Sequence, residues 1–97
     1  MPILTELEAA NAWAVCSKEE LPDRAIPIVL PAVDDYIKTA TGKDWGADNP
    51  VDPTAKMLAS VLFVRWLEDP GMVGRASDAG VVGLIGQLHA KALQGSG

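Results

Sequence analysis

The chain has 97 residues, 48% of them hydrophobic, and a formal net charge of -5. This length and apolar content predict one folded domain over residues 1–97 and exclude a disordered protein. The acidity argues against a surface that grips nucleic-acid phosphates, because such binding depends on Lys and Arg displacing counterions. The N-terminal residues lack a basic region followed by an apolar core, so we expect no signal peptide and a protein made in the cytoplasm.

Thr5 and Glu8 have the spacing of a capping box and predict a first helix over residues 6–16. Four apolar residues recur at helical spacing and predict one buried stripe: Leu7, Ala10, Trp13 and Ala14. Cys16 is the only cysteine, so neither a disulfide nor a cysteine-based metal site can form within one chain. We expect Cys16 to be a small buried side chain on this helix.

The second predicted helix covers residues 24–41, with Asp23 as its cap and Gly42 as the residue that ends it. Its apolar residues share one face: Ile26, Val29, Leu30, Val33, Ile37 and Ala40. Pro27 and Pro31 conflict with a regular helix, because an internal proline removes a hydrogen bond and crowds the preceding turn at a cost of about 3 kcal/mol. Either the helix begins near Pro27 and bends at Pro31, which we favour, or its regular part begins only at Pro31.

A long loop over residues 42–52 follows and carries Trp45. A tryptophan in such a loop has two interpretations. It folds back as a lid over the core, or it stays exposed as an anchor for another subunit, since large amphipathic side chains dominate interface energetics.

The central element is a helix predicted over residues 53–69, with Asp52 as its cap and Pro53 at its first position. Its apolar run is about 16 Å long, against a bilayer core of about 30 Å, so it is a core helix and not a membrane span. A helix that is apolar on nearly every side has to be covered on nearly every side. The cover comes from neighbouring segments or from other subunits. Arg65 in this helix either extends its stem through the core to water or forms an ion pair.

A last helix is predicted over residues 79–93, capped by Ser77 or Asp78. Three glycines at every third position make it weak, because each costs up to about 1 kcal/mol relative to alanine: Gly80, Gly83 and Gly86. They permit the close approach of another backbone, let the segment reorder on assembly, or mark a frayed end. The sequence as a whole therefore predicts an all-α bundle of about four helices.

Residues that carry catalytic chemistry are sparse. The single histidine, His89, has no second histidine or cysteine with which to share a metal ion. The glycine-rich segment around it lacks the preceding strand and the Lys-Ser/Thr ending of a phosphate-binding loop. We therefore expect no enzyme, no metal and no cofactor.

Three groups of residues resemble the head-tail connector family of tailed bacteriophages, small helical adaptors beneath the portal. A helix with a Tyr-Ile pair and a Thr-Gly ending is matched by Tyr36, Ile37, Thr41 and Gly42. A helix with a hydrophobic pair, an aromatic residue and an acidic residue is matched by Leu62, Phe63, Trp66 and Glu68, and residues 80–88 match a Val/Gly/Leu-rich segment after it. The pair Pro27 and Pro31 departs from the family pattern.

The resemblance implies a virion protein that forms a ring of about a dozen copies between the portal and tail-side connector proteins. The genome would pass through this ring without sequence-specific binding. It also implies no contact with a membrane. We expect subunit contacts at these residues: Trp13, Trp45, Arg65, Trp66, Val81, Val82, Leu84, Ile85 and Leu88. Trp66→Ala is expected to unfold the protomer, and Trp45→Ala to spare folding and weaken association.

The alternative is a small acidic helical regulator or interaction domain, similar to an antitoxin or adaptor, that binds one protein partner. A DNA-binding helix-turn-helix is disfavoured by the acidity.

Overall fold

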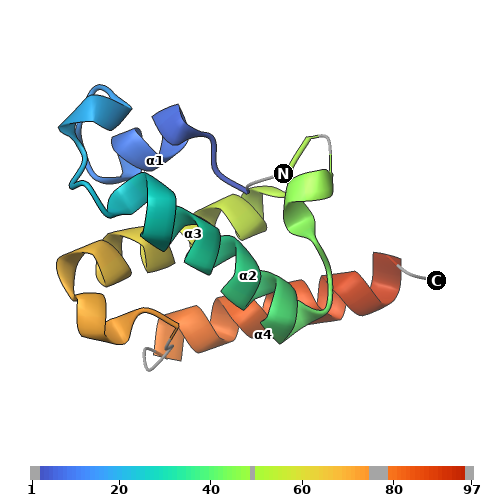
Figure 1. Ribbon diagram of the computed structural model, residues 1–97. Helices are drawn as coiled ribbons and strands as arrows, with labels where there is room; N and C mark the ends of the chain where they lie inside the picture. Colours follow the sequence, from blue (N-terminus) through green and yellow to red (C-terminus); the bar gives the residue numbers. More distant parts are fainter. Residues whose placement is uncertain (1–2, 49, 75–78, 96–97) are drawn as a thin grey trace.

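Four α-helices joined by short 3-10 and π turns make up the protein (Figure 1). The computed structural model describes residues 3–48, 50–74 and 79–95, and no strand occurs in these ranges. The helices are α1 (Glu6–Ala12), α2 (Leu30–Thr41), α3 (Pro53–Glu68) and α4 (Ala79–Gly95). The predicted all-α bundle of about four helices is confirmed.

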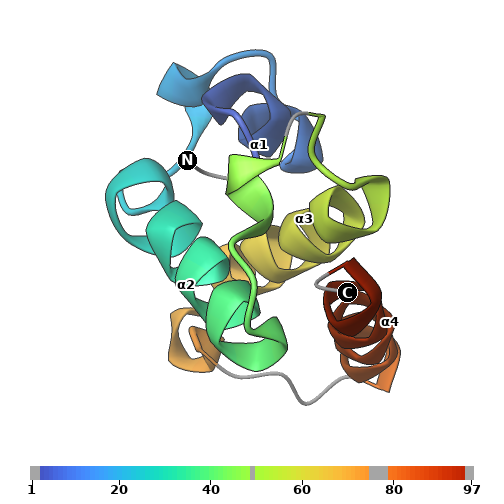
Figure 2. The ribbon, with the colours of Figure 1, turned by 90° about the vertical axis from the view of Figure 1, so that its right-hand side faces the viewer.

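Helix α3 lies at the centre, with α1, α2 and α4 each packed against it (Figure 2). Its start is as predicted: Pro53 is the first residue, and Asp52 Oδ1 accepts a hydrogen bond of 2.7 Å from the backbone N–H of Thr54. Near its C-terminus the carbonyl of Leu67 accepts a bond of 2.6 Å from Nη2 of Arg24, which satisfies one of the carbonyls that a helix end leaves open. Both ends are thus fixed by side chains.

Helix α1 is shorter than predicted and ends at Ala12 instead of residue 16. Ala14 takes the left-handed conformation (φ 64°), the N–H of Val15 donates to the carbonyl of Ala10 at 3.0 Å, and the N–H of Ala14 donates to that of Asn11 at 3.0 Å. This is a Schellman ending, which normally uses glycine, so alanine at this position conceals it in the sequence.

The early end of α1 overturns two further expectations. Cys16 is exposed, because it lies beyond the helix and not on its buried face. The stripe is also incomplete: Ala10 is buried, but Leu7 is 57% exposed and Ala14 is exposed. The capping box itself is confirmed, with Thr5 and Glu8 each accepting a hydrogen bond from the other's backbone N–H.

Pro27 and Pro31 accompany a π turn over Ala25–Val29, and the regular helix α2 begins at Leu30 instead of residue 24. Pro31 has no N–H and crowds the carbonyl four residues earlier, so the chain widens to bonds that span five residues. The N–H groups of Val29 and Leu30 accordingly donate to Arg24 and Ala25. The alternative with a late regular helix is therefore nearer to the structure than the bent helix.

Helices α2 and α4 end as follows. Gly42 closes α2 as predicted, in the left-handed conformation (φ 80°), and its N–H donates to the carbonyl of Lys38 at 2.7 Å. Helix α4 runs two residues beyond the predicted end at residue 93. Its predicted caps, Ser77 and Asp78, lie outside the described residues.

The N-terminal segment is tied to α2 by Asp34, whose Oδ1 accepts a hydrogen bond of 3.0 Å from the backbone N–H of Ile3. Burial raises the pKa of Asp34 above its ordinary value of 3.8, and the bond from Ile3 only partly offsets that effect. The ionised carboxylate therefore opposes folding, although its hydrogen bond anchors the chain.

Replacing Ala14 by glycine should stabilise the protein by up to about 1 kcal/mol, because glycine adopts the left-handed conformation without the Cβ clash. Urea denaturation measures the change. Ala90→Gly is the matched control at an exposed position inside α4, where glycine should cost about 1 kcal/mol. A loss of stability in Ala14→Gly would contradict the assigned turn.

Asp34→Asn should raise stability at neutral pH, because the amide oxygen still accepts the bond from Ile3 while the buried charge is removed. The raised native pKa means that the folded state holds the proton more tightly, so the cost of the wild-type carboxylate appears as pH rises above 3.8. The gain should therefore shrink in acid. Thermal melts at pH 7 and pH 3 test this, with Asp35→Asn at the exposed neighbour as control. An equal gain at both pH values would rule the assignment out.

Candidate functional site

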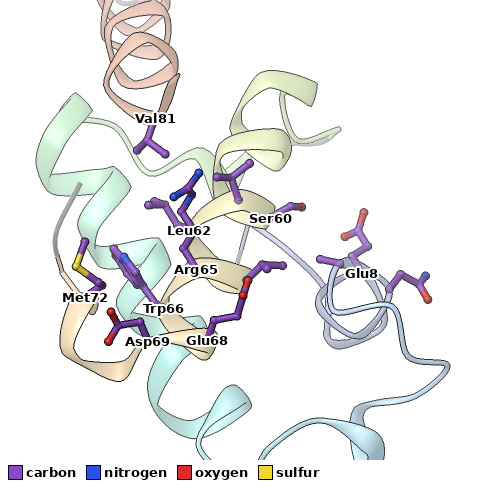
Figure 3. Close-up of a pocket in the computed structure, with 13 residues that line it drawn as sticks. Glu8, Ser60, Leu62, Arg65, Trp66, Glu68, Asp69, Met72 and Val81 are labelled. Carbon is purple, nitrogen blue, oxygen red and sulfur yellow. The ribbon is translucent and has the colours of Figure 1, made fainter. Parts of the chain in front are cut away.

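An open groove of about 1060 Å³ lies along the side of α3 that the other helices leave uncovered (Figure 3). Its floor is formed by residues of α3 at helical spacing, Val61, Val64 and Glu68, together with Ser60 and Arg65. Val61 and Val64 are only half-buried. One turn earlier on the same face, Met57 is 57% exposed. This face of α3 is thus incompletely covered, and its apolar part consists of Met57, Val61 and Val64.

One wall of the groove comes from α1 and is acidic. Glu8, Asn11 and Ala12 line it. The Glu8 carboxylate contacts Nζ of Lys56 on α3, and this hydrogen bond, with a further one from the Thr5 backbone, lowers the pKa of Glu8. This ion pair joins α1 to α3.

The far end of the groove is formed by Trp66, Met72 and Val81, and Asp69 adds a second acidic group near Glu68. Trp66 is fully buried, and its ring meets that of Tyr36 edge-on at 5.5 Å between centroids. The indole thus fills the core and contributes only to the boundary of the groove. Figure 3 shows Val81 entering from α4 above the α3 floor.

The structure separates the predicted contact residues into two groups. Four are buried within the protomer: Trp45, Trp66, Val81 and Leu88 are at most 2% exposed. Such side chains have almost no surface to offer a second copy in this conformation. The others reach the surface to different degrees: Val82 is 54% exposed, Arg65 is exposed, and Trp13, Leu84 and Ile85 are half-buried.

Sequence reasoning missed the residues that form the groove floor, above all Val61 and Val64. The signal was present, because Met57, Val61, Val64 and Glu68 follow one another at helical spacing. It was concealed by the apolar character of the remaining faces of α3. Only the placement of α1 and α4 decides which face stays open.

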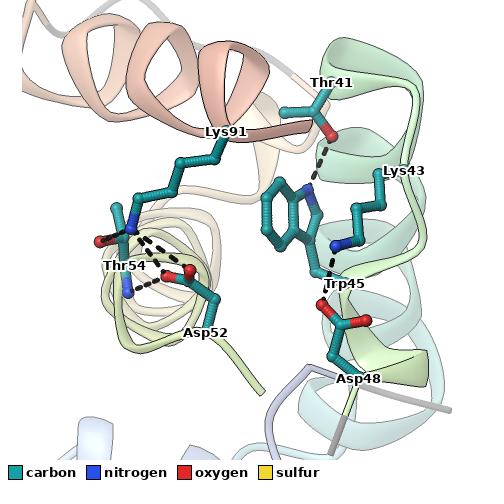
Figure 4. A network of polar contacts seen from close by, with 7 residues as sticks. All are labelled: Thr41, Lys43, Trp45, Asp48, Asp52, Thr54 and Lys91. Carbon is teal, nitrogen blue, oxygen red and sulfur yellow. Dashed lines mark hydrogen bonds and ion pairs between the residues drawn. The ribbon is translucent and has the colours of Figure 1, made fainter. Parts of the chain in front are cut away.

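Trp45 folds back onto the core, in agreement with the lid interpretation (Figure 4). Its Nε1 donates a hydrogen bond of 2.8 Å to the Thr41 hydroxyl, which in turn donates to the carbonyl of Ile37 at 2.7 Å. Lys43 lies over the ring at 4.5 Å from its centroid and pairs with Asp48 at 3.0 Å. The exposed-anchor interpretation of Trp45 is therefore wrong.

Lys91 fastens α4 to the beginning of α3, as Figure 4 also shows. Its Nζ lies 3.2 Å from Oδ2 of Asp52 and 3.2 Å from Oγ1 of Thr54. Burial raises the pKa of Asp52, but the bonds from Thr54 and Lys91 outweigh it and leave the pKa below its ordinary value. The ion pair fixes which face of α4 turns toward α3.

The described residues contain no cluster of three or more His, Cys, Asp or Glu side chains that could hold a metal ion. None of the helices within these ranges is long and apolar enough to cross a membrane. His89 is exposed on α4. The groove beside α3 is lined by both apolar and charged side chains.

Comparison with protein-family models, with curated proteins and with solved structures finds no match to this chain.

Trp66→Ala and Trp45→Ala should both destabilise the protomer, because both indoles are buried. We expect a loss of about 3–5 kcal/mol for Trp66, enough to unfold much of so small a domain. Trp45→Ala should also lose the bond to Thr41 and lower the melting temperature. Circular dichroism melts measure both, with half-buried Trp13→Ala as a milder control. An unchanged melting temperature in Trp45→Ala would contradict this and would agree with the expectation from the sequence that Trp45→Ala spares folding.

Proposed function

We propose that the chain is a structural subunit of a head-tail connector, which assembles into a ring of about a dozen copies between a phage portal and tail-side proteins. The observation that carries the proposal is the incompletely covered face of α3. A protomer of 97 residues that leaves Met57 57% exposed, and Val61 and Val64 half-buried in a groove, gains stability when another molecule covers that face.

The family resemblance adds the architecture of the assembly. Two of the residues that carry it, Trp66 and Tyr36, pack against each other at the junction of α2 and α3. The resemblance therefore involves core contacts of the bundle and not only residues scattered along the chain. A connector subunit needs rigid contacts between its helices, because each copy has to present two surfaces at a fixed angle for a ring to close.

Charge supports the same proposal. The net charge of -5 per copy would surround a central channel with negative potential if the acidic residues face it. Double-stranded DNA passes such a channel without adhering, because the Lys and Arg clusters that release counterions are lacking. Genome passage without sequence-specific binding is the role that this chemistry suits.

The alternative proposal is a small acidic regulator that binds one protein partner in the same groove. Its support is the presence of half-buried Val61 and Val64 in the groove, because an amphipathic helix lays its apolar face into an apolar groove. The two proposals differ in stoichiometry, since a regulator saturates at one partner and a connector continues to a closed ring.

Sedimentation velocity and negative-stain electron microscopy from micromolar to millimolar concentration test the proposal. We expect closed rings at high concentration that persist in high salt, because the contact is mainly apolar. A stable dimer that does not grow further, or a monomer at all concentrations, would overturn the connector and favour the regulator. Ile28→Asp changes a 59% exposed apolar residue outside the groove lining, so this variant should form the same rings as the wild type.

A further inference from the structure

Helix α4 is the least buried of the three longest helices. Among residues 80–94, whose side chains the structure describes, only Val81 and Leu88 are buried. Three further side chains are half-buried, those of Leu84, Ile85 and Ala92. In α3, by comparison, seven of 16 residues are buried. Less apolar surface is therefore exposed when α4 leaves its position than when the other helices come apart.

Two glycines of α4 have no packing reason within the protomer. A Cβ added at Gly83 or Gly86 meets nothing within 4 Å, so the neighbouring elements do not require glycine at either position. Each glycine disfavours the helical conformation up to about fivefold relative to alanine, which corresponds to about 1 kcal/mol. Helix α4 is thus intrinsically weak and draws its stability from packing on α2 and α3.

The polar contact of Lys91 adds little to this packing. Its Nζ lies 3.2 Å from Oδ2 of Asp52 and 3.2 Å from Oγ1 of Thr54, but its side chain is 46% exposed, so water screens the ion pair. Asp52 does not depend on α4, because its Oδ1 also accepts the backbone N–H of Thr54 and so caps α3. The start of α3 therefore stays fixed when α4 leaves.

The other three helices are joined to one another without α4. Four contacts join them or the segments that precede them, between Ile3 and Asp34, Glu8 and Lys56, Arg24 and Leu67, and Tyr36 and Trp66. Figures 1 and 2 show α1 and α4 on opposite sides of α3. Departure of α4 therefore leaves the contacts of α1 with α3 in place.

We infer that α4 opens as one unit in a minor state of the folded protomer, while α1, α2 and α3 keep their contacts. Such local opening is expected of an element that buries few apolar side chains. It brings Val81 and Leu88, two of the predicted subunit contacts, from the core to the surface, together with the apolar residues of α2 and α3 that α4 covers. The inference goes beyond the proposed function, because it holds for a connector subunit and for a regulator alike.

Native-state hydrogen exchange, followed by NMR at a series of low urea concentrations, tests the opening. We expect the amides of residues 84–92 to share one protection factor, at least tenfold below that of the slowest amides of α2 and α3. Their exchange should also depend less on urea, because opening of α4 alone exposes less surface than global unfolding. Equal protection and equal urea dependence in all helices would overturn the inference. Protection that declines gradually toward residue 95 would show fraying and would overturn it as well.

Two variants separate the opening of α4 from unfolding of the whole protomer. Gly83→Ala should raise the protection of the α4 amides up to about fivefold, because the added methyl group meets no neighbour. Ala10→Gly weakens α1, which the opening of α4 leaves intact. It should lower the protection of the slowest amides of α2 and α3 about fivefold or more and leave residues 84–92 unchanged.

The two variants can each contradict the inference. If the protection of α4 falls with that of α2 and α3 in Ala10→Gly, α4 opens only when the whole protomer unfolds. If Gly83→Ala leaves the protection of α4 unchanged, the stability of this helix does not control its opening. Either result would overturn the separate opening of α4.

Discussion

The structure depends on covering α3, a helix that is apolar on most of its circumference, with three short neighbours. Seven of its 16 residues are buried, and they contact α1, α2 and α4 together. Three helices cannot enclose a fourth completely when one of them has only 7 residues. The groove is the geometric consequence, and it lies where α1 is too short to cover α3.

Polar contacts join the covering helices to α3 in addition to the buried apolar residues of those helices. The pair of Glu8 and Lys56 places α1, and the contacts of Lys91 with Asp52 and Thr54 place α4. Such partly exposed ion pairs contribute little stability, about 0–1 kcal/mol each, but they have one preferred geometry. An apolar face alone would tolerate rotation of either helix and would leave the open side of α3 undefined.

Several residues of the groove side of α3 and of the outer face of α4 reduce the stability of the single protomer. Met57, Val82 and Leu93 expose apolar surface to water, and Gly86 weakens α4 although a Cβ there would meet nothing within 4 Å. A monomer under selection for stability alone would replace these residues readily. In the proposed assembly, burial of these apolar side chains would offset these costs.

The sequence by itself determined the helical class, the start of α3 at Pro53 and the end of α2 at Gly42, because capping depends on residues adjacent in the chain. It did not determine the end of α1, where Ala14 adopts a conformation that its side chain disfavours, or the π turn that relieves Pro31. Burial was also decided only by the tertiary structure. Periodicity groups residues on one face of a helix, but which face is covered depends on the distances and angles between helices, and these arise from contacts between residues far apart in the chain.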